Sequence, residues 1–257
     1  MSQTGYILVT ENVVKRFGGL VAVDRVSIKV PERKIVLIIG PNGSGKSTFV
    51  NVISGVYKAD EGKIVFRGVD ITNKPPHVIY RLGLVRTFQI PQPLRKLTVL
   101  ENVLLGDALH PGENVLKALI ERTWIKRESE LVERAFQILK FLRLDHLWDV
   151  ESWKLSGGQL KLVEIGRALM ANAKMIIMDE PIAGVNPTLA HEIFQRIQEI
   201  RDKLGVTFLI IEHRLDIALK YVDYVYAMAR GKVISEGPPE KVINDPQVIE
   251  AYLGGSH

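Results

Sequence analysis

The chain has 257 residues, of which 46% are hydrophobic and 25% charged, as in ordinary globular proteins. It contains no cysteine, which excludes disulfides and thiolate metal sites. The net charge of +5 comes from scattered basic residues, so we expect a mildly basic surface and no nucleic-acid interface. The first residues lack the basic-then-apolar pattern of a signal peptide, and no apolar run approaches the ~18 residues that span a bilayer.

The N-terminal part is rich in β-branched residues. Residues 7–14 and 21–30 are predicted to form antiparallel strands, because the second stretch alternates apolar and polar side chains. Residues 34–39 form a short apolar run, which is typical of a strand buried on both faces.

A glycine-rich loop follows that strand and fits the pattern G-x-x-x-x-G-K-[ST], and residues 48–54 are apolar at helical spacing. Strand, glycine loop and helix in this order predict a phosphate site, because backbone N–H groups and the helix N-terminus converge on the anion. Lys46 can reach the β- and γ-phosphates, and the Ser47 hydroxyl can bind Mg²⁺. The predicted phosphate-binding residues are Gly40, Pro41, Asn42, Gly43, Ser44, Gly45, Lys46, Ser47 and Thr48.

The middle of the chain is predicted to be helical. A glycine-turned hairpin over 62–71 and a strand over 83–89 precede helical spacing over 92–172. Thr98 and Glu101 fit a capping box at a helix start. One face of a later helix is expected to pack in the core through Leu131, Val132, Ala135, Phe136, Leu139 and Leu142.

Alternating strands and helices return after residue 174. We predict strands over 175–179, 206–211 and 223–228 and helices over 188–204 and 214–221, which indicate an α/β fold. The last residues, 231–257, are predicted to add a hairpin-like strand and a short helix after Pro238 and Pro239.

Two further motifs indicate chemistry. The strand over 175–179 ends in Asp179 and Glu180, and ligands bind at the carboxyl ends of parallel strands. Asp179 is suited to Mg²⁺, and Glu180 to accepting a proton from an attacking water. Ser156 can cap the helix that follows it, and Gly157 and Gly158 leave the first N–H groups bare, which predicts a second anion-binding helix end.

In this order along the chain, the motifs resemble the nucleotide-binding subunit of an ATP-binding-cassette (ABC) transporter. The resemblance covers essentially the whole chain and rests on the phosphate loop, Gln89, the segment from Leu155 to Gln159, the acidic strand end and His213. It implies a single ABC ATPase domain over 1–257. The P-loop NTPase (RecA-like) α/β core and an N-terminal antiparallel β subdomain would occupy 1–88 and 173–257, and an inserted α-helical subdomain 89–172.

The resemblance also implies roles for single residues. Phe17 would stack on the adenine of ATP, the alternative being an ordinary core aromatic. Gln89 would contact Mg²⁺ and the attacking water and couple the core to the helical subdomain, and His213 would contact the γ-phosphate. The residues implied to bind the ATP of a second chain are Ser156, Gly157, Gly158 and Gln159.

Within this family the chain is most similar to the ATPase subunits of branched-chain amino acid importers, judged from residues 83–89, 98–102 and 183–187. Asn186 stands where the wider family has aspartate, a departure that this branch shares. The alternatives are the ATPase of a lipopolysaccharide exporter, which usually has proline where this chain has Phe88, and a soluble ABC protein acting on ribosomes or nucleic acid.

The implied cofactors are ATP and Mg²⁺. The implied partners are a second ATPase subunit, identical or different, and transmembrane permease subunits. The resemblance implies no direct binding of the transported solute or of nucleic acid. It also implies a cytoplasmic location, peripheral on the inner face of the cell membrane.

Overall fold

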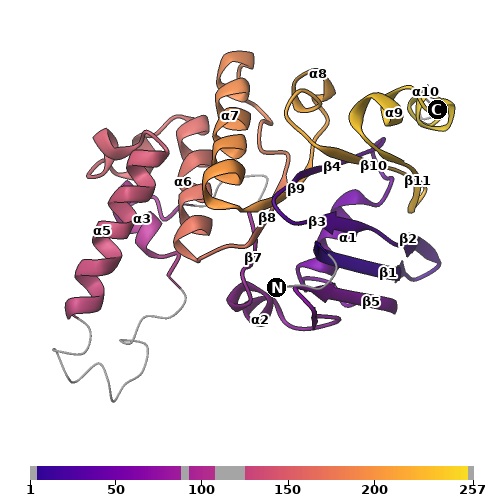
Figure 1. The fold of residues 1–257 in the computed structure, drawn as a ribbon, viewed down its shortest axis with the longest axis horizontal. Helices are drawn as coiled ribbons and strands as arrows, with labels where there is room; N and C mark the ends of the chain where they lie inside the picture. The colour runs from indigo at the N-terminus through magenta and orange to yellow at the C-terminus, as the bar shows by residue number, and fades with distance from the viewer. Residues whose placement is uncertain (1–4, 88–92, 108–124, 254–257) are drawn as a thin grey trace. The chain divides into compact units, whose positions relative to one another are not determined.

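The computed structural model describes residues 5–87, 93–107 and 125–253, and Figure 1 shows their fold. The chain divides into two compact units, one made of residues 1–89 and 174–257 and the other of residues 90–173. Within the described residues, no helix is both long and apolar enough to cross a membrane.

The larger unit contains a six-stranded sheet in the order β11-β10-β4-β9-β8-β7. Its strands are β4 (Ile35–Ile39), β7 (Leu84–Arg86), β8 (Met175–Asp179), β9 (Thr207–Ile211), β10 (Tyr224–Ala229) and β11 (Lys232–Gly237). The strands from β10 to β7 run parallel, and β11 is antiparallel to β10. Every residue of β4, β8 and β9 is buried, as expected for parallel strands covered on both faces.

A second, antiparallel sheet belongs to the same unit. Its strands are β1 (Tyr6–Phe17), β2 (Leu20–Val26), β3 (Lys29–Pro31), β5 (Glu61–Phe66) and β6 (Val69–Asp70). The long strand β1 pairs with β2, β3 and β5, so it forms the centre of this sheet. Leu8, Phe66, Phe49 and Ile38 belong to one buried core, which joins this sheet to the helix after β4 and to the parallel sheet. The predicted N-terminal antiparallel arrangement is therefore confirmed.

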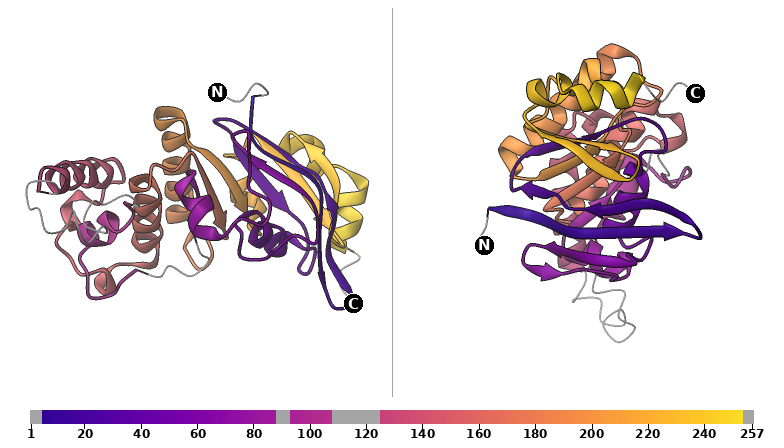
Figure 2. Two further views of the ribbon diagram at one scale, coloured as in Figure 1. Left: turned by 90° about the horizontal axis from the view of Figure 1, so that it is seen from below. Right: turned by 90° about the vertical axis from the view of Figure 1, so that its right-hand side faces the viewer.

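The helices of this unit are α1 (Lys46–Ile53), α2 (Pro76–Arg81), α7 (Pro187–Leu204), α8 (Leu215–Ala218), α9 (Pro239–Ile243) and α10 (Pro246–Leu253). In both views of Figure 2, α9 and α10 (yellow) lie beside β10 and β11. The short helix predicted after Pro238 and Pro239 is α9, and a second short helix that the sequence analysis did not predict, α10, begins at Pro246. The helix predicted over 214–221 is shorter and ends at Ala218.

The other unit is helical. It contains α3 (Val99–Leu104), α5 (Ile125–Phe141) and α6 (Gly157–Met170), which pack on one another, and short 3-10 helices at Asp145–Leu147 and Ser152–Lys154. The capping box of Thr98 and Glu101 is present at the start of α3, as predicted. Of the predicted apolar face, Leu131, Ala135, Leu139 and Leu142 are buried, whereas Val132 and Phe136 are half-buried.

Candidate nucleotide-binding and hydrolysis site

The phosphate loop joins β4 to α1, and two of its glycines are required by close contacts. Gly40 has φ +149°, and a Cβ there would lie 2.1 Å from the carbonyl oxygen of Met228. Gly45 has φ +98°, and a Cβ there would lie 2.3 Å from the carbonyl oxygen of Ala22. Because both contacts are with backbone, which cannot move aside, a side chain at either position would displace the loop.

The Lys46 side chain folds back over the loop that precedes it. Its ammonium donates hydrogen bonds to the carbonyl oxygens of Gly40 at 2.8 Å and Pro41 at 2.9 Å, and to Ser44 Oγ at 3.3 Å. Burial lowers the pKa of Lys46, and the nearby carboxylates of Glu180 and Asp179 partly offset this shift.

Helix α1 begins without a side-chain cap. Gly45 occupies the N-cap position, and no side chain accepts a hydrogen bond from the first-turn N–H groups in the described structure. Unpaired N–H groups at a helix start are satisfied by a side chain, by water or by an anion. The geometry of this loop therefore fits a bound phosphate.

The two predicted carboxylates lie where β8 ends. Asp179 is its last residue, and its Oδ2 lies 3.4 Å from Nη2 of Arg86. Burial raises the pKa of Asp179, whereas the Arg86 guanidinium lowers it in part. Glu180 has φ +51°, an unusual left-handed backbone, and its N–H donates to the carbonyl oxygen of Ile211 at the end of β9.

Glu180 and His213 lie side by side. Nε2 of His213 lies 3.3 Å from Oε1 of Glu180, and both side chains remain partly exposed. The two residues follow neighbouring strands, β8 and β9, while the phosphate loop follows β4 on the other side of β9. The structure thus places Lys46, Asp179, Glu180 and His213 together beyond the carboxyl ends of the parallel strands β4, β8 and β9.

Glu212 also lies at the carboxyl end of β9, and the sequence analysis did not identify it. Its buried carboxylate accepts the backbone N–H groups of Ile182 at 2.9 Å, His213 at 3.0 Å and Arg214 at 3.3 Å. Arg214 in turn donates to the carbonyl oxygen of Val185 at 3.1 Å. These bonds tie the loop after β8 to the loop after β9, so Glu212 fixes the backbone beside both Glu180 and His213.

Asn186 acts as a helix cap. Its side chain accepts the N–H of Leu189 at 2.9 Å and so begins α7.

Phe17, predicted to stack on adenine, lies at the end of β1 with 43% of its surface exposed. The alternative of an ordinary core aromatic is therefore wrong. Its ring makes an edge contact with Tyr57 at 5.3 Å between centroids, and the Lys15 ammonium lies 5.4 Å from its centre.

The residues around Ser156 lie in the helical unit and start α6. Ser156 Oγ accepts the N–H of Gln159 at 3.3 Å, and Gln159 Oε1 accepts the N–H of Ser156 at 2.9 Å, which forms a capping box. The predicted cap at Ser156 is thus present. A Cβ at Gly157 would meet nothing within 4 Å, so open space surrounds the first turn at that point.

The predicted magnesium ligands are only partly described. Ser47 and Asp179 offer hydroxyl and carboxylate oxygens, which are the ligands that Mg²⁺ prefers. Gln89, the third predicted ligand, lies outside the described residues. Among the residues that are described, no group of three or more histidine, aspartate or glutamate side chains could hold a metal by itself.

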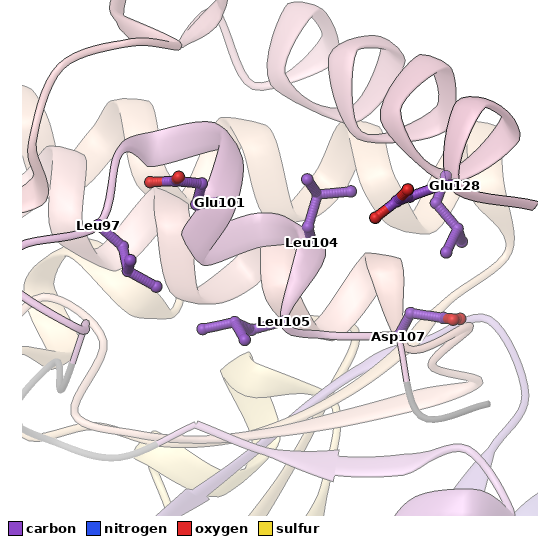
Figure 3. A pocket seen from close by; sticks show the side chains of 7 residues that line it. Leu97, Glu101, Leu104, Leu105, Asp107 and Glu128 are labelled. Carbon is purple, nitrogen blue, oxygen red and sulfur yellow. The ribbon is translucent and has the colours of Figure 1, made fainter. Parts of the chain in front are cut away.

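A pocket of about 460 Å³ lies in the helical unit (Figure 3). Leu97, Leu104 and Leu105 contribute apolar surface to its lining, and Glu101, Asp107 and Glu128 contribute carboxylates. Asp107 also forms an ion pair with Arg127 at 3.4 Å.

Comparison with known proteins decides the family. The sequence matches the family described as "ABC transporter" over residues 23–183, more than half of the chain. The chain belongs to this family. Over residues 232–257, this ABC ATPase also matches the family described as "Branched-chain amino acid ATP-binding cassette transporter".

Two similar relatives of this ABC ATPase are both named "Probable branched-chain amino acid transport ATP-binding protein LivG". The one from Archaeoglobus fulgidus is 60% identical over 96% of this chain and 95% of its own length. The one from Methanocaldococcus jannaschii is 57% identical over 99% of this chain and 100% of its own. Both names are those of branched-chain amino acid transport proteins, and neither is that of a lipopolysaccharide exporter or of a protein acting on ribosomes or nucleic acid.

Solved structures agree with the fold. The crystal structure of an ABC transporter cassette in its ADP conformation is 57% identical, with a TM-score of 0.86 over 98% of this chain and 100% of that one. A dimeric cassette in a post-hydrolysis state, bound to ADP and phosphate, is 27% identical, with a TM-score of 0.73 over 90% and 98%. The predicted P-loop NTPase fold and the prediction of an ATP-binding ATPase are confirmed.

Proposed function

We propose that this ABC ATPase powers an importer of branched-chain amino acids. The observation that carries the choice of substrate is the match of residues 232–257 to the branched-chain family, in a chain that shares 60% of its residues with a relative named for this transport. The ATPase binds permease subunits at the inner face of the membrane and does not contact the transported amino acid itself.

ATP binds at the carboxyl ends of the parallel strands, where Lys46, Asp179, Glu180 and His213 lie. The phosphates sit on the N–H groups at the uncapped start of α1, and the Lys46 ammonium turns from its own loop carbonyls to the β- and γ-phosphates. The exposed ring of Phe17 stacks on the adenine. Ser47, Asp179 and Gln89 would hold Mg²⁺, which would offset negative charge on the phosphates.

Glu180 is the general base of hydrolysis. Its carboxylate accepts a proton from the attacking water, and His213, 3.3 Å away, contacts the γ-phosphate on the same side of the site. Glu212 holds the two loops that carry these side chains together through hydrogen bonds to their backbone. This arrangement supports phosphoryl transfer to water, because orientation and charge stabilisation supply most of the catalysis in such reactions.

A second ATPase subunit completes each site. Ser156 and Gln159 pair with each other in the capping box, so the N–H groups of Gly157 and Gly158 are the ones presented to the nucleotide of the partner. ATP held between two chains favours their association, and hydrolysis removes that contribution. The permease converts this cycle of closure and opening into transport.

The helical unit provides the surface for the permease. Leucine side chains and carboxylates line its pocket together, which suits an amphipathic segment with both apolar and basic residues. Gln89 precedes this unit in the chain and links nucleotide binding to it.

The proposal is tested with the ATPase and its candidate permease subunits purified together and placed in lipid vesicles. We expect ATP-dependent uptake of leucine, isoleucine or valine, and no uptake with Lys46→Ala. Uptake of an unrelated solute only, or ATPase stimulation by nucleic acid with steep salt dependence, would contradict the proposal.

The docking surface is tested by co-purification with the permease. Leu105→Asp places a charge in the apolar lining of the pocket, at a residue that is 48% exposed, so permease binding should fall while the melting temperature stays near that of the wild type. Leu204→Asp is the matched control, because Leu204 is 52% exposed at the end of α7 in the other unit. Equal co-purification of both variants would refute the assignment of this pocket.

A further inference from the structure

The C-terminal helix α10 contacts the phosphate loop at its first residue. The N–H of Gly40 donates a hydrogen bond of 2.8 Å to the hydroxyl oxygen of Tyr252, which lies 212 residues later in the chain. Strand β4 ends at Ile39, so this N–H is the first one beyond the sheet ladder. The bond therefore holds the point where the strand turns into the loop.

Gly40 is also one of the residues that hold Lys46. Its carbonyl oxygen accepts a hydrogen bond of 2.8 Å from the Lys46 ammonium, while its N–H is held by Tyr252. The carbonyl oxygen of Met228 and the Oγ atom of Ser44 occupy the space where a Cβ of residue 40 would lie, so no side chain fits there. The orientation of this one residue thus connects the C-terminal helix to the lysine of the loop.

Helix α10 has a capped start and one buried side chain. Asp245 accepts the N–H of Gln247 at 2.9 Å at the start of the helix, and Val248 is buried. The helix packs on β11, and a pocket of about 630 Å³ has residues 41–44 in its lining together with Gln247, Glu250 and Ala251 of α10. Tyr252 therefore reaches the loop from a helix that packs on the edge strand of the parallel sheet.

We propose that Tyr252 is a positioning residue for nucleotide binding, whose hydroxyl sets the conformation of the phosphate loop before ATP arrives. Without this acceptor, the Gly40 N–H has no partner from the sheet, and the loop populates conformations that do not bind phosphate. Because only the competent fraction binds, the apparent dissociation constant rises in inverse proportion to that fraction. The inference rests on the proposed function, since it assumes that the loop binds ATP.

The test compares two tyrosine-to-phenylalanine variants of the full chain by titration with a fluorescent ADP analogue. Tyr252→Phe keeps the ring and removes the hydroxyl, and we expect the dissociation constant to rise about two- to tenfold, as for one lost hydrogen bond. Tyr226→Phe is the matched control. Its hydroxyl also accepts a backbone N–H, that of Lys29 at 3.0 Å, but on β3 and away from the loop, so the dissociation constant should not change.

Hydrogen exchange of the nucleotide-free protein separates positioning from general stability. Amides of residues 40–47 should exchange faster in Tyr252→Phe than in the wild type and in Tyr226→Phe. Equal affinity of Tyr252→Phe and the wild type, or equal exchange over 40–47, overturns the inference while the proposed function stands. Failure of the wild type to bind the analogue overturns both.

Discussion

Arg86 joins the helix behind the phosphate loop to the carboxylate that we propose as a magnesium ligand. Its guanidinium donates to Asn51 Oδ1 on α1 and, at 3.2 Å, to Oγ of Ser54, which directly follows that helix, and Nη2 lies 3.4 Å from Oδ2 of Asp179. Only 12% of the Arg86 side chain and 11% of the Asp179 side chain are exposed. Arg86→Met keeps the aliphatic bulk and removes the charge and all of these donors.

The distance sets the size of the expected effect. Two unit charges 3.4 Å apart attract each other by about 5 kcal/mol at an effective dielectric constant of ~20. Desolvation of both charges offsets most of this in the intact pair, but removing one partner leaves a buried charge and costs about 3–5 kcal/mol. Lys46 also interacts favourably with Asp179, so we expect the lower end of the range.

Urea unfolding of Arg86→Met measures this loss, with Arg201→Met as control. Arg201 pairs with Asp223 at 2.9 Å in the same unit and away from the site. Asp223 also pairs with the Lys34 ammonium at 3.2 Å and accepts the N–H of Ile35 at 2.8 Å, so it keeps partners when Arg201 is removed. The free energy of unfolding should fall by about 3 kcal/mol in Arg86→Met and by about 1 kcal/mol in the control.

The pH dependence tests the cause of that loss. Without the guanidinium, the pKa of Asp179 rises further above its ordinary value, because burial is then less opposed. A carboxyl with a raised pKa in the fold favours folding at low pH and loses this contribution as the pH rises through its folded-state pKa. The loss in free energy of unfolding caused by Arg86→Met should therefore grow between pH 5 and 8. A loss equal to that of Arg201→Met and constant with pH would refute the reasoning.

Three further changes test the site. Lys46→Ala removes the charged donor for the terminal phosphates and should abolish tight ATP binding in a fluorescence titration, and unchanged affinity would exclude Lys46 from the phosphate cradle. Glu180→Gln should lower turnover by about 10²–10⁴-fold and accumulate an ATP-bound dimer in size-exclusion chromatography, so a monomer with normal turnover would contradict both the base and the shared site. Burial raises the pKa of Glu212, so its contribution to stability is present at low pH and lost as the pH rises through its folded-state pKa. The stability difference between wild type and Glu212→Gln in urea unfolding should be largest near pH 4.5 and shrink toward pH 7.5, and a constant difference would refute it.

The parts of the site that sequence predicted depend on neighbours in the chain. The capping boxes of Thr98 with Glu101 and Ser156 with Gln159 each join residues three positions apart, so their pattern is visible without a fold. The strand over Met175–Asp179 was predicted with its observed bounds, because a continuous apolar run ending in two acids marks both its interior and its end.

The parts that sequence missed depend on distant residues. Arg86 lies 93 positions from Asp179, and Glu212 lies 30 positions from Ile182. In a linear reading, an arginine near a strand end and a glutamate before a histidine resemble solvated side chains. Only the pairing of β7 with β8 and of β8 with β9 brings these side chains to their partners.

The contrast between contacts of neighbouring residues and contacts of distant residues also explains why the motifs alone do not determine the site. The phosphate loop contains glycines and polar residues with little apolar surface, so burial fixes its backbone weakly. The loop after β8 is held in part by the buried side chain of Ile182. Side chains outside the motifs also hold these loops, through Tyr252 to Gly40 and through Glu212 to Ile182 and His213. A substitution at Glu212 would therefore leave the family pattern complete in the sequence while releasing the backbone that aims its residues.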